Sequence, residues 1–301
     1  MKILVITGSR ADYGMLEWPI KVLSADPFFD VEVCCVTGQL TDDGFEYAYC
    51  EARSAVEADR PDIAIMLGDR FEILAAATAC HLDRVPIAHI AGGDVTEGSY
   101  DDAMRDCISR MASIHFVTSS SAMARLTHMG LRNVHLVGSP GIDYIKHADW
   151  RKERPIKEPY VVVNYQVETI DGTNDFSKIR LPKDKRLVFI MPNPDRGSDH
   201  IRVQIEAYRR ICADSTTVYE SLLYAEYLNL MAHADEVIGN SSSMLYECPE
   251  LGVKTRMIGK RQLGRTIPWG DGNASERIAK VFKYSMPIPY KKGENAPDYD
   301  R

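Results

Sequence analysis

Short hydrophobic runs rich in Val and Ile recur along the whole chain, and each is followed by a polar or amphipathic stretch long enough for a helix. The first half contains such runs at residues 3–7, 31–37, 63–67, 86–90, 114–118 and 134–137. The second half contains further runs at residues 160–165, 187–191, 216–219, 236–238 and 255–258. Continuous apolar runs are typical of strands covered on both faces, so we expect those of the first half to be fully buried strands of a parallel sheet.

The two sets of strands predict two domains. The chain has 301 residues, more than one hydrophobic core usually serves. Residues 147–159 are charged, contain two prolines and show no periodicity, which is typical of a linker. We therefore expect domains at residues 1–150 and 151–301, with residues 286–301 as a surface extension. The predicted fold class is α/β: two doubly wound, Rossmann-like domains that face each other across a cleft, as in the glycosyltransferase-B architecture.

The composition excludes several classes of protein. The formal net charge is -7 and the isoelectric point about 5.7, which argues against a nucleic-acid binder, because affinity for a phosphate backbone needs clustered Lys and Arg. The first apolar run is too short for a signal peptide or a membrane span, so we expect a cytoplasmic protein. The seven cysteines have no CxxC spacing and are expected to be buried free thiols, and no Cys or His cluster has the spacing of metal ligands.

The sharpest local signal is the stretch Gly-Asn-Ser-Ser-Ser at residues 239–243, which follows a predicted strand and precedes a helical pattern with Glu247 on its second turn. The hydroxyls of Ser241, Ser242 and Ser243, with the unpaired amides of a helix N-terminus, would suit a diphosphate. Glu247 could then accept hydrogen bonds from the two hydroxyls of a ribose. The alternative is a serine N-cap without a ligand.

Two other loops of the second half could take part. Arg261 and Arg265 follow the next predicted strand, and either guanidinium could bind phosphate oxygens, although a solvated basic loop would have the same composition. Asn193 and Asp195 stand at another strand end, in a stretch that equally fits an ordinary turn.

In the first half, Arg10 lies in a strand-to-helix loop that has neither the GxGxxG pattern nor the lysine spacing of a P-loop. A Rossmann dinucleotide site is therefore not supported. Arg10 could hold a diphosphate from the opposite wall of the cleft, or it could pair with Asp12 at the surface.

Acidic residues collect at two strand ends and at the start of the helix that follows: Asp69, Asp94, Glu97, Asp101 and Asp102. Carboxylates crowded into one crevice raise each other's pKa values, and a carboxylate poised in this way can take or deliver a proton. The alternative is that these acids cap helices. His89, on a predicted strand, could contact a ligand or be a buried histidine with satisfied hydrogen bonds.

Together these segments resemble the hydrolysing UDP-N-acetylglucosamine 2-epimerases of sialic-acid and related pathways. The stretches that match the family in wording and order are residues 7–14, 68–72, 89–105, 192–195, 239–247 and 261–265. The resemblance runs from residue 2 to about residue 282.

The resemblance implies that UDP is eliminated from C1 of the sugar with loss of the C2 proton, and that water adds to the glycal to give N-acetylmannosamine and UDP. It implies catalytic roles for Asp69, Asp94, Asp101 and Glu97. The implied substrate-binding residues are Arg10, His89, Arg105, Asn193, Asp195, Ser241, Ser242, Ser243, Glu247 and Arg261. No cofactor or metal is expected, because arginines and helix ends can neutralise the diphosphate, and a homo-oligomer is expected by resemblance.

Three positions depart from the family pattern. Asp94 stands where the family usually has Glu, and Asp106 and Gln166 stand where it usually has His. A glutamine can form hydrogen bonds but cannot transfer a proton near neutral pH. These departures leave open a catalytically altered UDP-sugar-binding protein, and the fold leaves open a glycosyltransferase that transfers the sugar to an acceptor.

Overall fold

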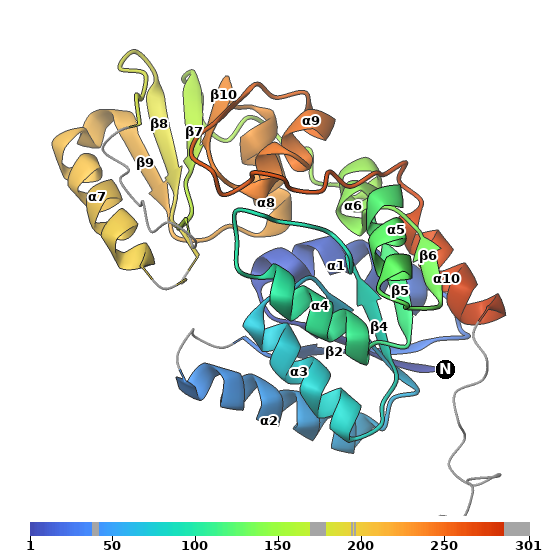
Figure 1. The fold of residues 1–301 in the computed structure, drawn as a ribbon. Coiled ribbons are helices and arrows are strands. Elements are labelled where there is room, and N and C mark those ends of the chain that lie inside the picture. Colours follow the sequence, from blue (N-terminus) through green and yellow to red (C-terminus); the bar gives the residue numbers. More distant parts are fainter. Residues whose placement is uncertain (38–41, 169–178, 194, 196, 286–301) are drawn as a thin grey trace, which may run out of the picture.

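The computed structural model describes residues 1–37, 42–168, 179–193, 195 and 197–285, apart from the side chains of residues 10, 42 and 43. It contains two parallel β-sheets, each flanked by helices (Figure 1). In spatial order the first sheet consists of β2 (Asp30–Cys35), β1 (Lys2–Thr7), β3 (Ile63–Leu67), β4 (Ile87–Ile90), β5 (Ile114–Val117) and β6 (Val134–Leu136). The second consists of β11 (Thr255–Met257), β10 (Glu236–Gly239), β7 (Tyr160–Asn164), β8 (Arg186–Ile190) and β9 (Thr216–Tyr219).

Helices cover both faces of each sheet. Those of the first half are α1 (Arg10–Ser24), α2 (Asp42–Asp59), α3 (Phe71–Leu82), α4 (Asp102–Met111), α5 (Ser120–His128) and α6 (Pro140–His147). Those of the second half are α7 (Ser198–Ile211), α8 (Tyr224–Ala232), α9 (Glu247–Leu251) and α10 (Ala274–Tyr284). Each hydrophobic run of the sequence forms a strand, as predicted.

Alternate residues of the central strands enter different cores. Ile3 and Val5 of β1 pack in a cluster with residues of α1 and α10, whereas Leu4 and Ile6 pack with residues of α2 and α3. A strand covered on both faces needs an apolar side chain at every position, which explains the continuous runs. The expectation of full burial is wrong for β2 and β6, because they lie at the two edges of the sheet and have partly or fully exposed positions.

The last helix returns to the first sheet. Ala274, Ile278 and Phe282 of α10 are buried in the core of β1, β3 and β5, and Phe282 meets the ring of Phe116 edge-on with centroids 5.3 Å apart. Figure 1 accordingly shows α10 beside β6, away from the second sheet. The chain therefore crosses between the two sheets twice, once after α6 and once before α10. We call residues 265–273, which make the second crossing, the return segment.

Candidate active site

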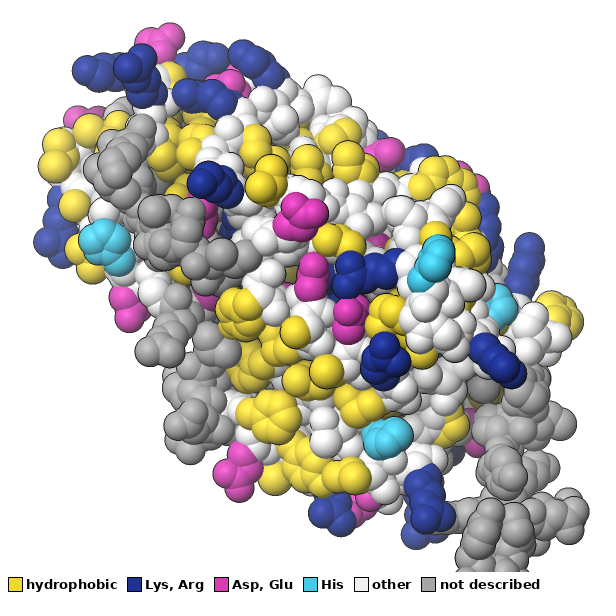
Figure 2. Space-filling view, viewed as in Figure 1, with side chains coloured by type: hydrophobic (Ala, Val, Ile, Leu, Met, Phe, Trp, Pro, Cys, Tyr) yellow, Lys and Arg dark blue, Asp and Glu magenta, His cyan; other side chains and the backbone are white. Residues whose placement is uncertain are grey.

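The carboxyl ends of β3, β4 and β5 bring three polar loops together, where ligand crevices form in parallel sheets. Asp69 follows β3, Asp94 follows β4, and Thr118 follows β5. The loop after β4 turns sharply at Gly93, whose φ is 77°; a Cβ there would lie 2.6 Å from the Ala122 carbonyl oxygen. This turn directs residues 94–101 across the sheet edge. Figure 2 shows acidic and basic side chains gathered where the two domains meet on this face.

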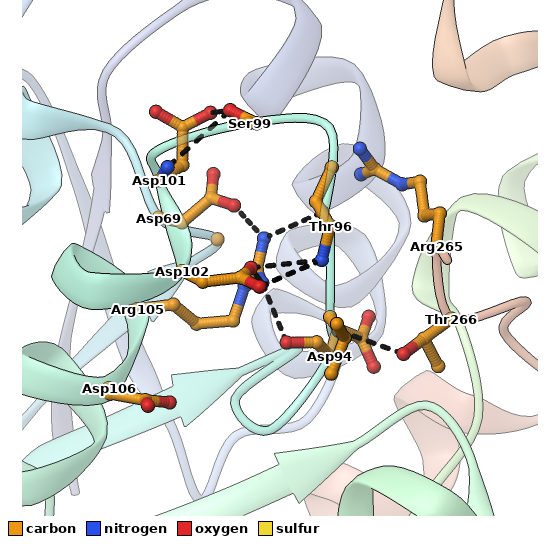
Figure 3. Close-up of polar contacts among 12 residues, drawn as sticks. Asp69, Asp94, Thr96, Ser99, Asp101, Asp102, Arg105, Asp106, Arg265 and Thr266 are labelled. Carbon is orange, nitrogen blue, oxygen red and sulfur yellow. Dashed lines mark hydrogen bonds and ion pairs between the residues drawn. The ribbon is translucent and has the colours of Figure 1, made fainter. Parts of the chain in front are cut away.

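Arg105, on the second turn of α4, organises the acidic residues (Figure 3). Its buried guanidinium forms ion pairs with Asp69 and Asp102, and it also donates to the Asp94 carbonyl oxygen at 2.6 Å and to Thr96 Oγ1 at 3.3 Å. Burial lowers the pKa of Arg105 to about 10, so it remains charged at neutral pH. These contacts fit a role for Arg105 in positioning the carboxylates, and the substrate contact expected from the sequence stays a prediction.

The Asp94 carboxyl group titrates near neutral pH. Its Oδ1 accepts a hydrogen bond from Thr118 Oγ1 at 2.8 Å. Burial raises the pKa of Asp94 to about 7, with a further contribution from Asp102, while Thr118 and Arg265 oppose the rise. A carboxyl group with this pKa is suited to exchange protons at neutral pH.

The other acids of the loop lie further out. Asp101 accepts a hydrogen bond from Ser99 Oγ and makes no side-chain cap of α4, while Asp102 accepts from the Thr96 amide at 3.0 Å with both oxygens. Glu97 is exposed and lies against Gly264 of the second domain, where a Cβ would be 2.2 Å from its Cδ. Asp69, Asp94 and Asp102 thus surround Arg105, and Asp101 and Glu97 lie nearer the facing domain.

His89 lies in the interior of the first domain, beneath the loop that carries Asp69. It is completely buried, its Nδ1 is 2.9 Å from Ser109 Oγ, and its Nε2 is 2.7 Å from the Gly68 carbonyl oxygen. Burial lowers the pKa of His89 to about 4, so the ring is neutral. Because both ring nitrogens form hydrogen bonds, the structure favours the alternative of a buried histidine that supports the loop carrying Asp69, and the substrate-binding role expected for His89 stays a prediction.

In the second domain, a buried amide network shapes the serine-rich loop after β10. Gly239 has φ 153°, and a Cβ there would lie 1.9 Å from the Asn164 carbonyl oxygen. Asn240 Oδ1 accepts from the Gln166 amide at 2.6 Å, and Asn240 Nδ2 donates to the Gln166 carbonyl at 2.8 Å. The Gln166 side chain donates to Asn164 and accepts from the Asn193 amide. Gln166 therefore links the loops that follow β7, β8 and β10 by hydrogen bonds.

The serines do not begin a regular α-helix. Residues Ser242–Met244 form a 3-10 turn, in which Ser241 Oγ accepts from Ser243 Oγ at 3.0 Å, and α9 begins only at Glu247. The prediction that Glu247 lies on the second turn of a helix is wrong. Pro249 has no N–H to donate to a preceding turn, which favours its place in the first turn of α9.

Glu247 has an unused acceptor. Its Oε1 accepts from the Tyr224 hydroxyl at 3.3 Å, whereas its buried Oε2 has no partner within the described part of the chain. Burial raises the pKa of Glu247 above its usual value. A buried carboxylate oxygen without a donor is costly, and paired ligand hydroxyls would satisfy it.

The remaining predicted ligand residues lie around this loop. Arg261 donates from Nε to the Val167 carbonyl at 3.0 Å, and burial lowers its pKa. Asp195 pairs across the domain boundary with Arg70, N to O 3.5 Å, and Asn193 has an exposed side chain. Arg10 begins α1, but its side chain lies outside the described residues.

The loop of Asp94 is bound directly to the second half of the chain. The Val95 amide donates to Thr266 Oγ1 at 2.8 Å, and the Thr266 amide donates to the Val95 carbonyl at 2.9 Å. Gly98 lies against the carbonyls of residues 260 and 261, where a Cβ would come within 2.4 Å of both oxygens. The sequence indicated Arg265 only as one of two candidates for binding phosphate. It did not indicate Thr118 or Thr266, because no local pattern at these residues shows which distant residues they contact.

Three general expectations can also be compared with the structure. All seven cysteines are free, but the expectation that they are buried is wrong for Cys35, Cys50 and Cys107, which are exposed. Within the described residues, no group of three or more His, Cys, Asp or Glu side chains could hold a metal ion. None of the described helices has the length and apolar character required to cross a membrane.

Two doubly wound sheets with facing polar loops define an α/β protein of the glycosyltransferase-B type. The family model described as UDP-N-acetylglucosamine 2-epimerase matches residues 2–267, and the chain belongs to this family. A UDP-N-acetylglucosamine 2-epimerase of Neisseria meningitidis serogroup B is 27% identical over 311 residues, covering 88% of this chain and 81% of that protein. A GDP/UDP-N,N'-diacetylbacillosamine 2-epimerase (hydrolyzing) of Campylobacter jejuni is 30% identical over 236 residues, covering 72% of this chain and 61% of that protein.

Solved structures confirm the predicted fold class. The UDP-GlcNAc 2-epimerase of Methanocaldococcus jannaschii in complex with UDP-GlcNAc and UDP has a TM-score of 0.76 at 16% identity, covering 94% of this chain and 100% of that chain. The S. aureus MnaA-UDP co-structure has a TM-score of 0.75 at 16% identity, covering 98% of this chain and 99% of that chain.

Proposed function

We propose that this protein is a hydrolysing 2-epimerase that converts UDP-N-acetylglucosamine, or a related UDP-acetamido sugar, and water into UDP and the free 2-epimeric sugar. The observation that carries the proposal is the cluster of Asp69, Asp94 and Asp102 around a buried arginine, opposite a loop in which Glu247 Oε2 has no partner among the described residues. One side of the site offers groups for proton transfer, and the other offers groups for a nucleotide. We expect the catalytic assembly to be a homo-oligomer that needs no cofactor.

The second domain would hold the nucleotide. Glu247 Oε2 would accept from the ribose hydroxyls. Arg261 and the serine hydroxyls, joined by Arg10 from the first domain, would bind the diphosphate. Their combined donors would stabilise the charge that develops on UDP as it departs.

The first domain would perform the proton transfers. A carboxylate among Asp69, Asp94 and Asp101 removes the proton from C2, the electrons of that bond form the C1–C2 double bond, and the C1–O bond breaks with its electron pair leaving on UDP. Water then adds its hydroxyl to C1 and a carboxyl group returns a proton to C2 on the opposite face. Asp94, with a pKa of about 7, is well placed to exchange a proton in either step.

An NMR time course with UDP-N-acetylglucosamine in deuterated water tests this function. We expect UDP and N-acetylmannosamine that carries deuterium at C2. Formation of UDP-N-acetylmannosamine would instead identify a non-hydrolysing epimerase. Binding of the substrate without any product would favour the altered binding protein.

A diacetamido sugar is the second substrate to test. The Campylobacter jejuni relative, at 30% identity, is named for N,N'-diacetylbacillosamine. The same time course with the UDP form of that sugar, run against UDP-N-acetylglucosamine at equal concentration, would give the ratio of the two kcat/KM values.

A further inference from the structure

The return segment is fastened to the first domain at several points before it reaches α10. Besides the two hydrogen bonds between Val95 and Thr266, the Trp269 amide donates to the Thr118 carbonyl at 2.8 Å. The Trp269 carbonyl accepts from the Ser139 amide at 2.8 Å. These main-chain contacts follow the ends of β4, β5 and β6, so the first residue of the segment is fixed relative to the carboxylate cluster.

That first residue is Arg265. Its Nε donates to the Tyr246 hydroxyl, its guanidinium lies 5.2 Å from the centroid of the Tyr246 ring, and the same hydroxyl donates to the Thr266 carbonyl at 3.2 Å. Figure 3 shows the guanidinium beside Thr96, on the loop that also carries Asp94. Within the described residues no carboxylate lies within ion-pair distance of Arg265, so its charge is not balanced by a partner.

The charged and titratable groups that face Asp94 come from three elements. Asp102 and Arg105 lie on α4, Tyr246 precedes α9, and Arg265 belongs to the return segment. Arg105 is already paired with Asp69 and Asp102 and meets only the main chain of Asp94. Since Val95, next to Asp94, is hydrogen-bonded to Thr266, next to Arg265, Arg265 is the cation whose charge is available to the Asp94 carboxylate.

We propose that Arg265 is a positioning residue for Asp94: the return segment holds its guanidinium where it favours the ionised carboxylate, and so sets the pH at which this group exchanges protons. The catalytic meaning of the inference rests on the proposed function. The electrostatic coupling itself can be measured in the folded protein without substrate.

The test is a double-mutant cycle on stability as a function of pH, measured by urea unfolding of the full chain. Asp94 has a pKa of about 7 when folded, so it is protonated at pH 5.5 and ionised at pH 8.5. Arg265→Met should therefore lower the urea midpoint more at pH 8.5 than at pH 5.5. This pH-dependent difference should shrink when Arg265→Met is made in the Asp94→Asn background. If the loss has the same pH dependence in both backgrounds, the inference is wrong.

Two further variants separate charge from packing. Arg265→Lys keeps the cation and should restore most of the pH dependence of stability. If Arg265 acted only through packing and its hydrogen bond to Tyr246, the lysine would not restore it. Arg209→Met is the matched control, because it removes an ion pair with Glu206 on the surface of α7, outside the site and the return segment, and its effect should add to that of Asp94→Asn at both pH values.

Turnover gives an independent readout. If the wild-type protein releases UDP from a UDP-acetamido sugar, the limb of its pH profile due to Asp94 should move to higher pH in Arg265→Met, by about one unit. An active Arg265→Met variant with an unmoved limb would overturn the inference. A wild type that releases no UDP would overturn the proposed function and leave the stability cycle to decide the role of Arg265.

Discussion

Replacing Asp94 by Asn should make the protein more stable and less active. Burial raises the folded-state pKa of Asp94 to about 7, above the ordinary value of 3.8, so the folded state binds the proton more tightly than the unfolded state does. The wild type therefore loses stability as the pH rises from about 4 to about 7, and the loss is complete above that range. An asparagine has nearly the shape of the protonated acid, and its Oδ1 can still accept from Thr118.

The size of the effect follows from the two pKa values. Compared with a group that stays neutral in both states, Asp94 lowers the free energy of unfolding by about 4 kcal/mol at pH 8.5 and by about 1.5 kcal/mol at pH 5, where only the unfolded chain releases the proton. Asp94→Asn removes this cost. Its advantage in the free energy of unfolding over the wild type should therefore grow by about 2 to 3 kcal/mol between pH 5 and pH 8.5.

The assay is urea unfolding of both proteins at a series of pH values. Asp12, with a pKa of about 6, and the buried His89 and His115, with pKa values of about 4, also make stability depend on pH. Because both proteins contain these groups, their contributions cancel in the difference. Turnover should fall by at least about 100-fold, as for loss of a general acid or base. An Asp94→Asn protein that is no more stable than the wild type at pH 8.5 would refute the reasoning.

Three further outcomes test other parts of the site and fold. Glu247→Gln should weaken UDP binding by about 10-fold or more in calorimetry, because hydrogen bonds to a charged acceptor contribute about 1.5–3 kcal/mol; 2'-deoxy-UDP should show a smaller difference between the two proteins. Gly239→Ala should lower both stability and UDP affinity, since its Cβ would meet the Asn164 carbonyl at 1.9 Å, and retention of both would argue against this loop geometry. Asp143→Ala should lower the free energy of unfolding in urea by about 3 kcal/mol, because its carboxylate accepts from the amide and hydroxyl of Ser275 at 2.6 and 2.7 Å at the start of α10; an unchanged value would show that α10 contributes little to the first core.

The strands could be predicted from the sequence because each central strand is covered on both faces. Val161 and Val163 of β7 face one cluster while Tyr160 and Val162 face another, so the run is apolar without interruption. The edge positions of β2 and β6 could not be predicted in the same way, since an edge is a property of strand order. The packing of α10 against the first sheet could not be predicted for a related reason. The amphipathic pattern of a helix predicts that one face is buried, but not which core that face packs against.

The acidic side of the site could be predicted as a group because parallel strands end at the same edge. The sequence could not predict which carboxylate has a pKa near 7, because that depends on the direction of each side chain and on its partners. Asp69 and Asp102 form ion pairs with the buried Arg105, whereas the Asp94 carboxylate accepts a hydrogen bond from the Thr118 hydroxyl. The contact between Val95 and Thr266 joins residues 171 positions apart, and no local pattern marks such a pair.

Burial is the main reason why Asp94 takes up a proton, and the charges of the cluster explain why this carboxylate does so rather than its neighbours. Asp69, Asp94 and Asp102 carry three negative charges when ionised, and Arg105 and Arg265 supply two positive charges. In a partly buried site an unbalanced charge is costly, and one proton removes the imbalance. Arg105 binds the carboxylates of Asp69 and Asp102 directly, whereas Asp94 has no ion-pair partner among the described residues, so the proton goes to Asp94. The position of Arg265 near this residue then decides how close to neutral pH the proton is exchanged.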